Sequence, residues 1–451
     1  HPEIQKSFFN DIYNVKIGYQ YLSLKGAENG GLKDANSFIA GQSYDERTVP
    51  VKMTNASSEK ISRLLLLNQQ VELPVGLNDS NDSTPRLIWK NSTSYNWLKR
   101  KFYTDHVYRE LFAHVFLDTN YTQDSVLINQ FANYSKLEFD LNPLLNSGAD
   151  RYEINLMFDA NFQITEYRLN GKKYPVFSTV QLFPGIAIKA KKFTSRVYFI
   201  SSFYKRLNNG YGIGAEGEIK LSSSLLSFTF SSRDSCPPLF LFHTYSNHFI
   251  WDRNYASIRN HSAKIVYQKT WNKLETSAGI SIQNWKNHHF LNSYSEPEVN
   301  KDAITMTEST LRVQYKFRHW RVYSESCFQS SDHRDIIRKP GFVQFLQVLI
   351  SDSVFKSKAF LQAGPGVKYV SSYLLPSFNP ALEEFYNGQQ IMSKAFYQLH
   401  FSIQLTISQV ELYLAAEHLN AGWGNRNYFY AVDYPLPGRI IKFGIKWLLK
   451  D

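Results

Sequence analysis

The sequence predicts an all-β protein, an antiparallel transmembrane β-barrel of about 14–18 strands with long extracellular loops. Three observations predict it. Many segments of about 8–12 residues alternate between apolar and polar side chains. Aromatic residues, 16% of the 451 residues, gather at the ends of these segments, and short connections alternate with long polar ones. We expect the whole chain, 1–451, to form this single barrel domain.

The clearest alternation lies near the C-terminus. In Tyr397–Thr406 every odd-numbered residue is apolar and every even-numbered residue is polar, and Gln409–Glu417 and Arg439–Leu449 also alternate with a period of two. A period of two is the signature of a strand with two different faces. The pattern recurs in Val15–Tyr21, Tyr211–Leu221, Ser262–Gln268, Glu275–Gln283, Leu311–Arg318 and Phe342–Ile350.

Two architectures produce such strands, a soluble β-sandwich and a membrane barrel. The strands approach the ~10 residues that cross a bilayer at a tilt, whereas soluble strands average about 5–6. Aromatic residues such as Tyr21, Trp285 and Trp320 stand at strand ends, where a membrane interface favours them. A tight connection at Ile407–Ser408 contrasts with long loops, and together these features favour the barrel. The predicted loops are 26–47, 75–98, 118–150, 286–303 and 420–437.

Composition excludes several other classes of protein. The longest apolar runs are far below the ~18 residues that a membrane-spanning helix needs. Cys236 and Cys327 are the only cysteines, too few for a disulfide framework, and whether they pair stays open. The net charge is +11, but the basic clusters are short, so we expect no nucleic-acid partner.

The last strand carries a pattern that outer-membrane barrels use for assembly, polar–x–Gly–x–x–aromatic–x–hydrophobic. Lys442, Gly444, Trp447 and Leu449 stand at these positions. An unpaired edge strand can be captured by strand addition before the barrel closes. We therefore expect the barrel assembly machinery and outer-membrane lipid as partners, with other outer-membrane proteins as further candidates.

Five stretches, spread from the first tenth of the chain to its end, carry a family resemblance. They are Glu28–Leu32 (ENGGL), Lys99–Tyr108, Cys236–Asn254, Tyr373–Tyr386 and Glu417–Trp447. In their order and spacing the chain resembles the Bacteroidota "putative porin" family of outer-membrane β-barrels. The resemblance implies a bacterial outer-membrane location and passive diffusion of solutes, and it implies no catalytic residues, so we expect no enzyme. Since members of that family carry further barrel segments before the ENGGL-like stretch, the resemblance leads us to expect an N-terminally trimmed copy.

Charged residues on the polar faces of the strands are the candidate pore lining. Cations outnumber acids among them, and charges of one sign set the field in a pore, so the sequence predicts passage of small hydrophilic, anionic solutes. The alternative for any one residue is a structural ion pair with a neighbouring strand. The candidates are Lys16, Lys220, Lys264, Arg312, Lys316, Arg318, Arg321, Glu411, Glu417, Lys442 and Lys446.

Other sites have little support in the sequence. The histidines show no metal-binding spacing, no cofactor motif appears, and His400 with Ser402 is too weak a pattern for a lipid hydrolase. Apolar patches at Leu111–Leu117 and Val126–Phe131 lie within predicted loop sequence. Such patches favour a second hypothesis, in which loops plug the barrel and the protein is a subunit of a larger outer-membrane assembly, secretion or uptake complex.

Overall fold

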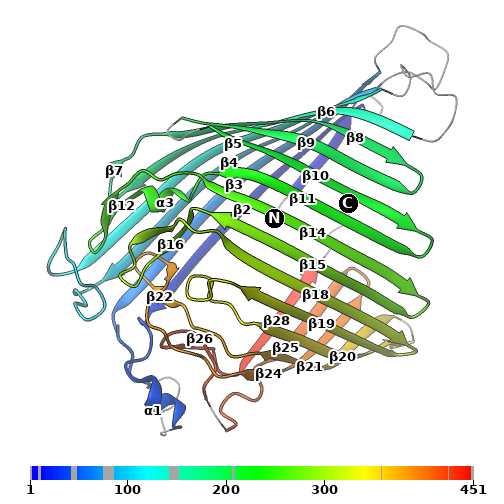
Figure 1. Cartoon of the computed structure of the whole chain (residues 1–451). Helices are drawn as coiled ribbons and strands as arrows, with labels where there is room; N and C mark the ends of the chain where they lie inside the picture. Colours follow the sequence, from blue (N-terminus) through cyan, green and yellow to red (C-terminus); the bar gives the residue numbers. More distant parts are fainter. Residues whose placement is uncertain are drawn as a thin grey trace.

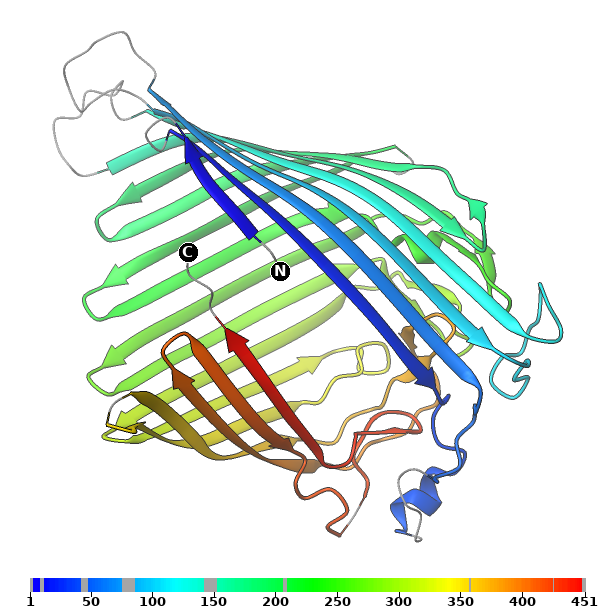
Figure 2. The same cartoon turned by 180° about the vertical axis from the view of Figure 1, so that it is seen from behind.

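A single curved sheet dominates the computed structural model, which describes residues 3–8, 12–41, 48–74, 86–141, 152–205, 209–356, 358–424 and 426–447. The sheet is 20-stranded and curls into a barrel wall (Figures 1 and 2). Its strands are β1 (Glu3–Phe8), β2 (Tyr13–Glu28), β3 (Ala56–Pro74), β4 (Arg86–Thr104), β5 (Thr122–Asp140), β6 (Tyr152–Leu169), β7 (Lys172–Lys173), β8 (Phe177–Ala190), β9 (Phe193–Tyr204), β10 (Gly210–Leu221), β11 (Ser224–Ser235), β14 (Ile258–Trp271), β15 (Leu274–Lys286), β18 (Ile304–Phe317), β19 (Trp320–Ser331), β20 (Phe342–Val354), β21 (Ala359–Val370), β24 (Phe396–Ile407), β25 (Val410–Glu417) and β28 (Ile440–Trp447).

The strands follow one another around the wall in chain order, each antiparallel to the next, with the two-residue β7 added at the end of β6. Most are longer than the ~9–11 residues that a tilted strand needs to cross a bilayer. Strands β1 and β28 lie at the two edges of the sheet (Figure 2). Within the described residues, β1 pairs only with β2 and β28 only with β25.

The two faces of the sheet differ in chemistry. Residues directly opposite each other on paired strands share a face. Ile265, Ile280 and Phe328 lie on one face, and each is half-exposed in the isolated chain. Lys264 lies on the other face, level with Ser281. An apolar outer face toward lipid and a polar inner face toward the lumen are what a membrane barrel requires.

The two ends of the barrel are built differently. At one end, here the turn end, strands β8–β9, β10–β11, β14–β15, β18–β19 and β24–β25 are joined by two residues each. The first residue has a positive φ in four of these turns, as tight hairpins require. These residues are Ser222, Asn272, Arg318 and Ser408.

The opposite end, here the loop end, carries the connections that have helices and strands of their own. They contain helices α1 (Ala35–Ile39) and α3 (Leu239–Phe242) and four small two-stranded sheets (Figure 1). These sheets are β12 (His243–Tyr245) with β13 (Ile250–Asp252), β16 (His288–Leu291) with β17 (Pro297–Asn300), β22 (Ser377–Asn379) with β23 (Glu384–Tyr386), and β26 (Phe429–Ala431) with β27 (Tyr434–Pro435). In outer-membrane barrels the long loops are extracellular.

The barrel fold is confirmed, but the sheet has more strands than the 14–18 predicted, and two predicted loops are wrong. Segment 75–98 includes the first part of β4, and segment 118–150 includes all of β5; residues 75–85 and 142–150 lie outside the described residues. The reason is visible in β4: Leu98 and Phe102 lie on its inner face and Asn91 on its outer face, so its alternation is blurred. Loops 286–303 and 420–437 are present, and within 26–47 residues 42–47 are outside the description.

Among the described residues, no helix is long and apolar enough to cross a membrane.

Candidate functional site

The inner wall holds nearly all of the predicted pore-lining charges. Register shows this directly: Lys220 is opposite Leu225, which is opposite Gln268, then Ser277, then Arg312. The same alternation places on this face Lys16, Lys264, Lys316, Arg321, Glu411, Glu417, Lys442 and Lys446.

Arg318 is the exception, and its assignment to the pore lining was wrong. The residue is the first of the two-residue β18–β19 turn, with φ +51°. Its guanidinium carbon lies 5.3 Å from the ring centroid of Phe317, whose side chain lies on the outer face. The alternation of β18 ends one residue earlier, which the sequence pattern alone did not reveal.

Several wall charges form ion pairs between neighbouring strands. Arg312 Nη2 lies 2.8 Å from Glu325 Oε1, and Lys316 Nζ lies 2.6 Å from Glu275 Oε1. Lys442 Nζ lies 2.8 Å from Glu417 Oε2. These pairs are half-exposed to the lumen, where water screens them, so they fix side-chain positions more than they stabilise the fold.

Other cations on the wall have no such partner. Across the part of the chain that the structure describes, no carboxylate lies within 4.0 Å of the charged groups of Lys220, Lys264 or Arg321. Lys220 also lines a cavity of about 650 Å³ near the turn end, together with Arg312 and several hydroxyl and amide side chains. This part of the lumen is polar and carries positive charge.

The loop end has a packed core of its own. One cluster joins Met53, Phe102, Phe112 and Ala381, so that three loops meet the inner face of β4. A second cluster joins the first, the next-to-last and the last of the long loops: it consists of Leu32, Phe38, Leu375, Tyr428, Phe429 and Val432. The loops therefore fold inward and pack on one another. Of the two predicted apolar patches, Leu111–Leu117 belongs to this core through Phe112, whereas Val126–Phe131 is part of β5.

Asn247 ties two loops to the wall. Its side-chain oxygen accepts hydrogen bonds from the backbone N–H groups of Leu117 and Asp118, at 2.9 and 2.8 Å. Its Nδ2 donates to the carbonyl oxygen of Asp118 and to Thr122 Oγ1, and its own N–H donates to Asp124 Oδ1. Because the residue is only 1% exposed, water cannot replace these bonds.

His248, the next residue, adds a second tie. Its Nδ1 donates to the carbonyl oxygen of His114 at 2.9 Å, so its Nε2 is free to accept from the Thr122 hydroxyl at 2.8 Å. The ring stacks on Phe112 with centroids 4.1 Å apart. Burial lowers the pKa of His248, which keeps the ring neutral and this pattern intact.

Arg100 holds the β22–β23 hairpin from the wall side. Its guanidinium donates to the carbonyl oxygens of Leu382 and of Ala381, the latter at 2.9 Å. Glu383 lies 3.3 Å from Lys60 Nζ and 3.7 Å from Arg100 Nη1. The hairpin is thus fixed to β3 and β4 by charge as well as by packing.

These loop residues were not among the predicted sites, although a signal existed. Arg100, Asn247 and His248 all lie within stretches that carry the family resemblance. The ENGGL stretch has a physical reason as well. Gly30 and Gly31 have φ of +65° and +89°, and a Cβ on Gly31 would lie 3.1 Å from the backbone oxygen of Asp433.

The predicted assembly signal lies on β28, except Leu449, which is outside the described residues. Lys442 and Gly444 are on the inner face, and the ring of Tyr413 occupies the space where a Cβ on Gly444 would be. Trp447 is on the outer face at the end of the strand and is exposed. The glycine therefore makes room for an aromatic ring of the preceding strand.

Cys236 and Cys327 are both free thiols. No group of three or more His, Cys, Asp or Glu side chains that could hold a metal ion exists among the described residues.

Comparison with solved structures identifies the fold. The ferric-catecholate import receptor Fiu of E. coli, in its closed form, superposes with a TM-score of 0.64 at 9% identity, covering 97% of this chain and 72% of that chain. The FrpB iron transporter of Neisseria meningitidis gives 0.57 at 9% identity, covering 98% and 78%. A mutant of the ferric enterobactin receptor PfeA of Pseudomonas aeruginosa gives 0.61 at 8% identity, covering 98% and 79%. At these identities the likeness shows the barrel fold and nothing of the ligand.

No curated protein matches the chain in sequence. A family model described as "Putative porin" matches residues 4–451, nearly the whole length. With the barrel fold and the apolar outer face, this match places the protein in the outer membrane. The chain belongs to the putative porin family of outer-membrane β-barrels.

Proposed function

We propose that the protein is a channel for passive diffusion of small hydrophilic solutes, that it prefers anions, and that its loop end sets the width of the path. The observation that carries the proposal is the set of wall cations without carboxylate partners, Lys220, Lys264 and Arg321. Carboxylates without an ion-pair partner among the described residues also lie on this face, at Glu218, Glu308 and Glu411, so the proposal rests on the excess of cations over acids among the predicted lining residues. An excess of fixed charge of one sign in a lumen favours permeant ions of the opposite sign. Outer-membrane lipid and the barrel assembly machinery are the partners that this function requires.

The ion pairs on the wall do not cancel this field. Arg312, Lys316 and Lys442 are neutralised by carboxylates that lie on adjacent strands. Partnered charges contribute little net potential, whereas an isolated charge next to a low-dielectric wall focuses the field into the lumen. The selectivity therefore depends on a few residues and can be removed without disturbing the pairs.

A second candidate function is a plugged barrel that acts as a subunit of an uptake or secretion complex. The inward packing of the loops around Phe112 and Phe102 favours it, because buried apolar side chains at one end obstruct a water-filled path. Two of the structural neighbours are named as import receptors or transporters of iron, and this proposal would extend a role in uptake to the present chain. The two functions differ in an easily measured property, conductance of the purified protein.

The test is the reversal potential of the purified chain in a planar bilayer under a KCl gradient. The diffusion channel is expected to conduct alone, with chloride favoured over potassium. Replacing Lys220, Lys264 and Arg321 together with Gln is expected to lower the chloride preference. A silent protein that co-purifies with stoichiometric partners would support the plugged subunit instead.

A matched control removes one positive charge outside the lumen. Lys101 neighbours Arg100 on β4, faces the outer side and pairs with Glu59. Lys101→Gln is expected to leave the reversal potential unchanged. If the control shifts it as much as the triple replacement does, the wall cations do not set the selectivity.

A further inference from the structure

A cavity of about 440 Å³ lies on the inner wall near the loop end, and its volume is within the ~300–1,000 Å³ typical of small-molecule sites. Residues of β5, β6, β8, β9 and β11 line it, and segment 236–239, which follows β11, borders it as well. Register places Gln163, Thr179 and Tyr204 side by side on neighbouring strands, because Thr179 is opposite both of the others. The cavity is therefore formed by the wall and by the start of the loop that carries α3.

Arg233 supplies this cavity with a positive charge that no carboxylate neutralises. It lies on the inner face of β11, and among the described residues no carboxylate lies within 4.0 Å of its guanidinium. The carboxylate of the next residue, Asp234, pairs instead with Arg259, at 3.0 Å. Lys205, exposed just after β9, is a second cation of the lining. The lining thus favours a ligand that carries a negative charge.

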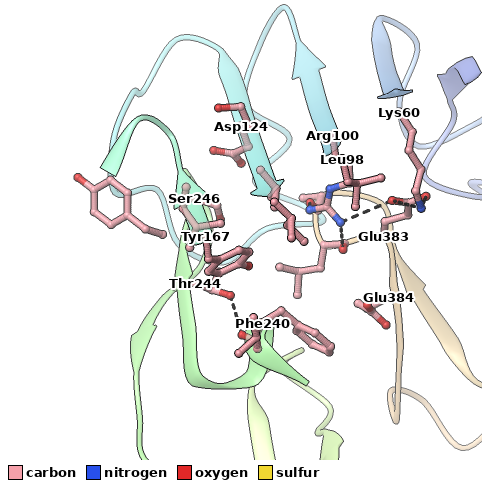
Figure 3. Close-up of a pocket in the computed structure, with 18 of the residues that line it drawn as sticks. Lys60, Leu98, Arg100, Asp124, Tyr167, Phe240, Thr244, Ser246, Glu383 and Glu384 are labelled. Carbon is pink, nitrogen blue, oxygen red and sulfur yellow. Dashed lines mark hydrogen bonds and ion pairs between the residues drawn. The ribbon is translucent and has the colours of Figure 1, made fainter. Parts of the chain in front are cut away.

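The neighbouring cavity beside Arg100 differs in this respect (Figure 3). Gln130 and Leu239 border both cavities. In the neighbouring cavity Lys60 and Arg100 are both engaged by Glu383, at 3.3 and 3.7 Å. An anionic ligand would have to displace that carboxylate, so the cavity beside Arg233 is the better site for an anion.

Uncharged polar side chains complete the lining. The Thr179 hydroxyl and the Gln130 amide make no hydrogen bond among the described residues. Gln163 Nε2 donates to Thr165 Oγ1 at 3.2 Å, which leaves its side-chain oxygen open to a donor. A ligand with several hydroxyl groups suits such a lining, because each hydroxyl both donates and accepts.

The ring of Tyr204 gives the cavity an apolar surface between these groups and Arg233. The intervening strand, β10, has a glycine at this level, because Gly210 is opposite Ser202. A Cβ on Gly210 would lie 3.5 Å from Tyr204 Cε2, so the ring lies beside bare backbone. An aromatic ring of this kind packs well against the C–H face of a sugar ring, since both surfaces are flat and apolar.

We infer that this cavity is a binding site for a monosaccharide that carries one carboxylate, a sugar acid. Its carboxylate accepts two parallel hydrogen bonds from Arg233, its ring packs on Tyr204, and its hydroxyls bond to Thr179 and Gln163. One small molecule reaches all four, because they line the same cavity and Thr179 and Tyr204 lie between the strands of the other two. The inference rests on the proposed channel, through which the solute reaches the wall, and it names a class of anion for that channel.

The test is saturation-transfer NMR of the detergent-solubilised full chain, titrated with glucuronate. Glucose, which lacks the carboxylate, and cyclohexanecarboxylate, which lacks the hydroxyls, are titrated in parallel. Glucuronate is expected to bind about tenfold more tightly than either, because each of the other two lacks one set of hydrogen bonds.

Three variants locate the binding. Arg233→Gln is expected to weaken glucuronate binding about tenfold and to leave glucose binding unchanged. Thr179→Val removes only a hydroxyl, so it is expected to weaken both sugars about threefold and to leave cyclohexanecarboxylate unchanged. Lys368→Gln is the matched control: the residue is an inner-wall cation that does not line this cavity, and the variant should bind all three compounds as wild type does.

Heat-modifiable gel migration shows that each variant is folded, and Thr179→Val keeps the test valid even if Arg233→Gln fails to fold. No binding of glucuronate, equal binding of glucose or of cyclohexanecarboxylate, or unchanged glucuronate affinity in a folded Arg233→Gln would overturn the inference. The NMR measurement reports binding whether or not the lumen conducts. A chloride-selective channel that binds no glucuronate would therefore contradict the sugar-acid site alone, and a silent barrel that binds glucuronate would contradict the channel alone.

Discussion

The loop end and the turn end of the barrel are stabilised in different ways. At the turn end two residues join five pairs of neighbouring strands, and the backbone itself makes the connection through residues of positive φ such as Asn272. At the loop end, segments far apart in sequence meet in buried clusters around Phe38 and Phe112. The turn end is therefore defined locally, whereas the loop end depends on contacts between distant segments.

The same difference separates the strands, which build the barrel wall, from the loops, which we propose control passage through it. The strands and their turns produce a wall whose inner face carries most of its charged side chains, with an apolar part near the loop end at Leu98 and Phe102. In the proposed channel the loops determine what can pass through the lumen, because Arg100, Asn247 and His248 fix the positions of the loops at one end. Variants at the two ends should accordingly have different consequences.

The largest effect is expected for Phe112→Ala at the loop end. Phe112 is 3% exposed, so truncation leaves a cavity and should cost the loop assembly about 3–5 kcal/mol. Hydrogen exchange of segment 105–121 should rise sharply while the strands stay protected. Ile280→Ala on the lipid face is the control and should leave this exchange unchanged; equal effects of both variants would contradict a separate loop-end core.

Asn247→Ala should have the next largest effect. It leaves the N–H groups of Leu117 and Asp118 without their acceptor in a partly buried site, which costs about 1–2 kcal/mol. The same exchange measurement reports it. Asn292 accepts similarly from Tyr294 and Glu296 in a more exposed loop, and Asn292→Ala should leave segment 105–121 protected.

At the turn end, Asn272→Val should cost about 1–2 kcal/mol, because a β-branched residue is strained at positive φ. Asn272→Gly should cost less than the valine, since glycine adopts the φ of +45° without strain. Thermal unfolding of the detergent-solubilised barrel measures both. A valine variant as stable as the glycine variant would show that turn geometry does not matter here.

The smallest effect is expected from a fall in pH, which should loosen the packing of the loop end. Burial lowers the pKa of His289 to about 4, and both of its ring nitrogens lack partners. Because the pKa of His289 in the folded chain lies below the ordinary ~6.5, the loop end has its full stability above pH ~6.5. It loses stability as the pH falls toward 4, since the buried ring resists taking up a proton that the unfolded chain binds readily. Burial lowers the pKa of His248 in the same direction.

Exchange rates of the loop end between pH 7 and 4 measure this loosening. In His289→Leu the acid dependence should be smaller, because the titrating ring is gone. His319→Gln, at the turn end, is the matched control and should retain the full dependence. Identical profiles for wild type and His289→Leu would contradict the assignment.

The strands were predictable where their two faces differ clearly. Tyr397–Thr406 predicts β24, which spans Phe396–Ile407, because lipid and lumen alone decide its pattern. Strands β4 and β5 were partly missed because Phe102 packs on inward loops, and Asn91 and Asn133 hydrogen-bond each other across their outer faces. On each face, contacts with residues distant in the sequence replace the lumen water or the lipid that the alternating pattern assumes.

The candidate site was predictable only in part for the same reason. Alternation places Lys220 and Lys442 on the inner face, but whether each is paired depends on register between strands. Lys442 meets Glu417 from β25, and Lys220 meets no carboxylate among the described residues. The loop residues Asn247 and His248 act through Thr122 and His114, contacts that no local sequence pattern encodes.

Single-channel conductance shows whether the loop end controls the path through the barrel. Wild type, Phe112→Ala, Asn247→Ala and Asn272→Val are compared in the same bilayer and salt. Both loop-end variants should conduct more than wild type, and Asn272→Val should match wild type. Unchanged conductance in both loop-end variants, or an equal rise in Asn272→Val, would show that the loop end does not control the path.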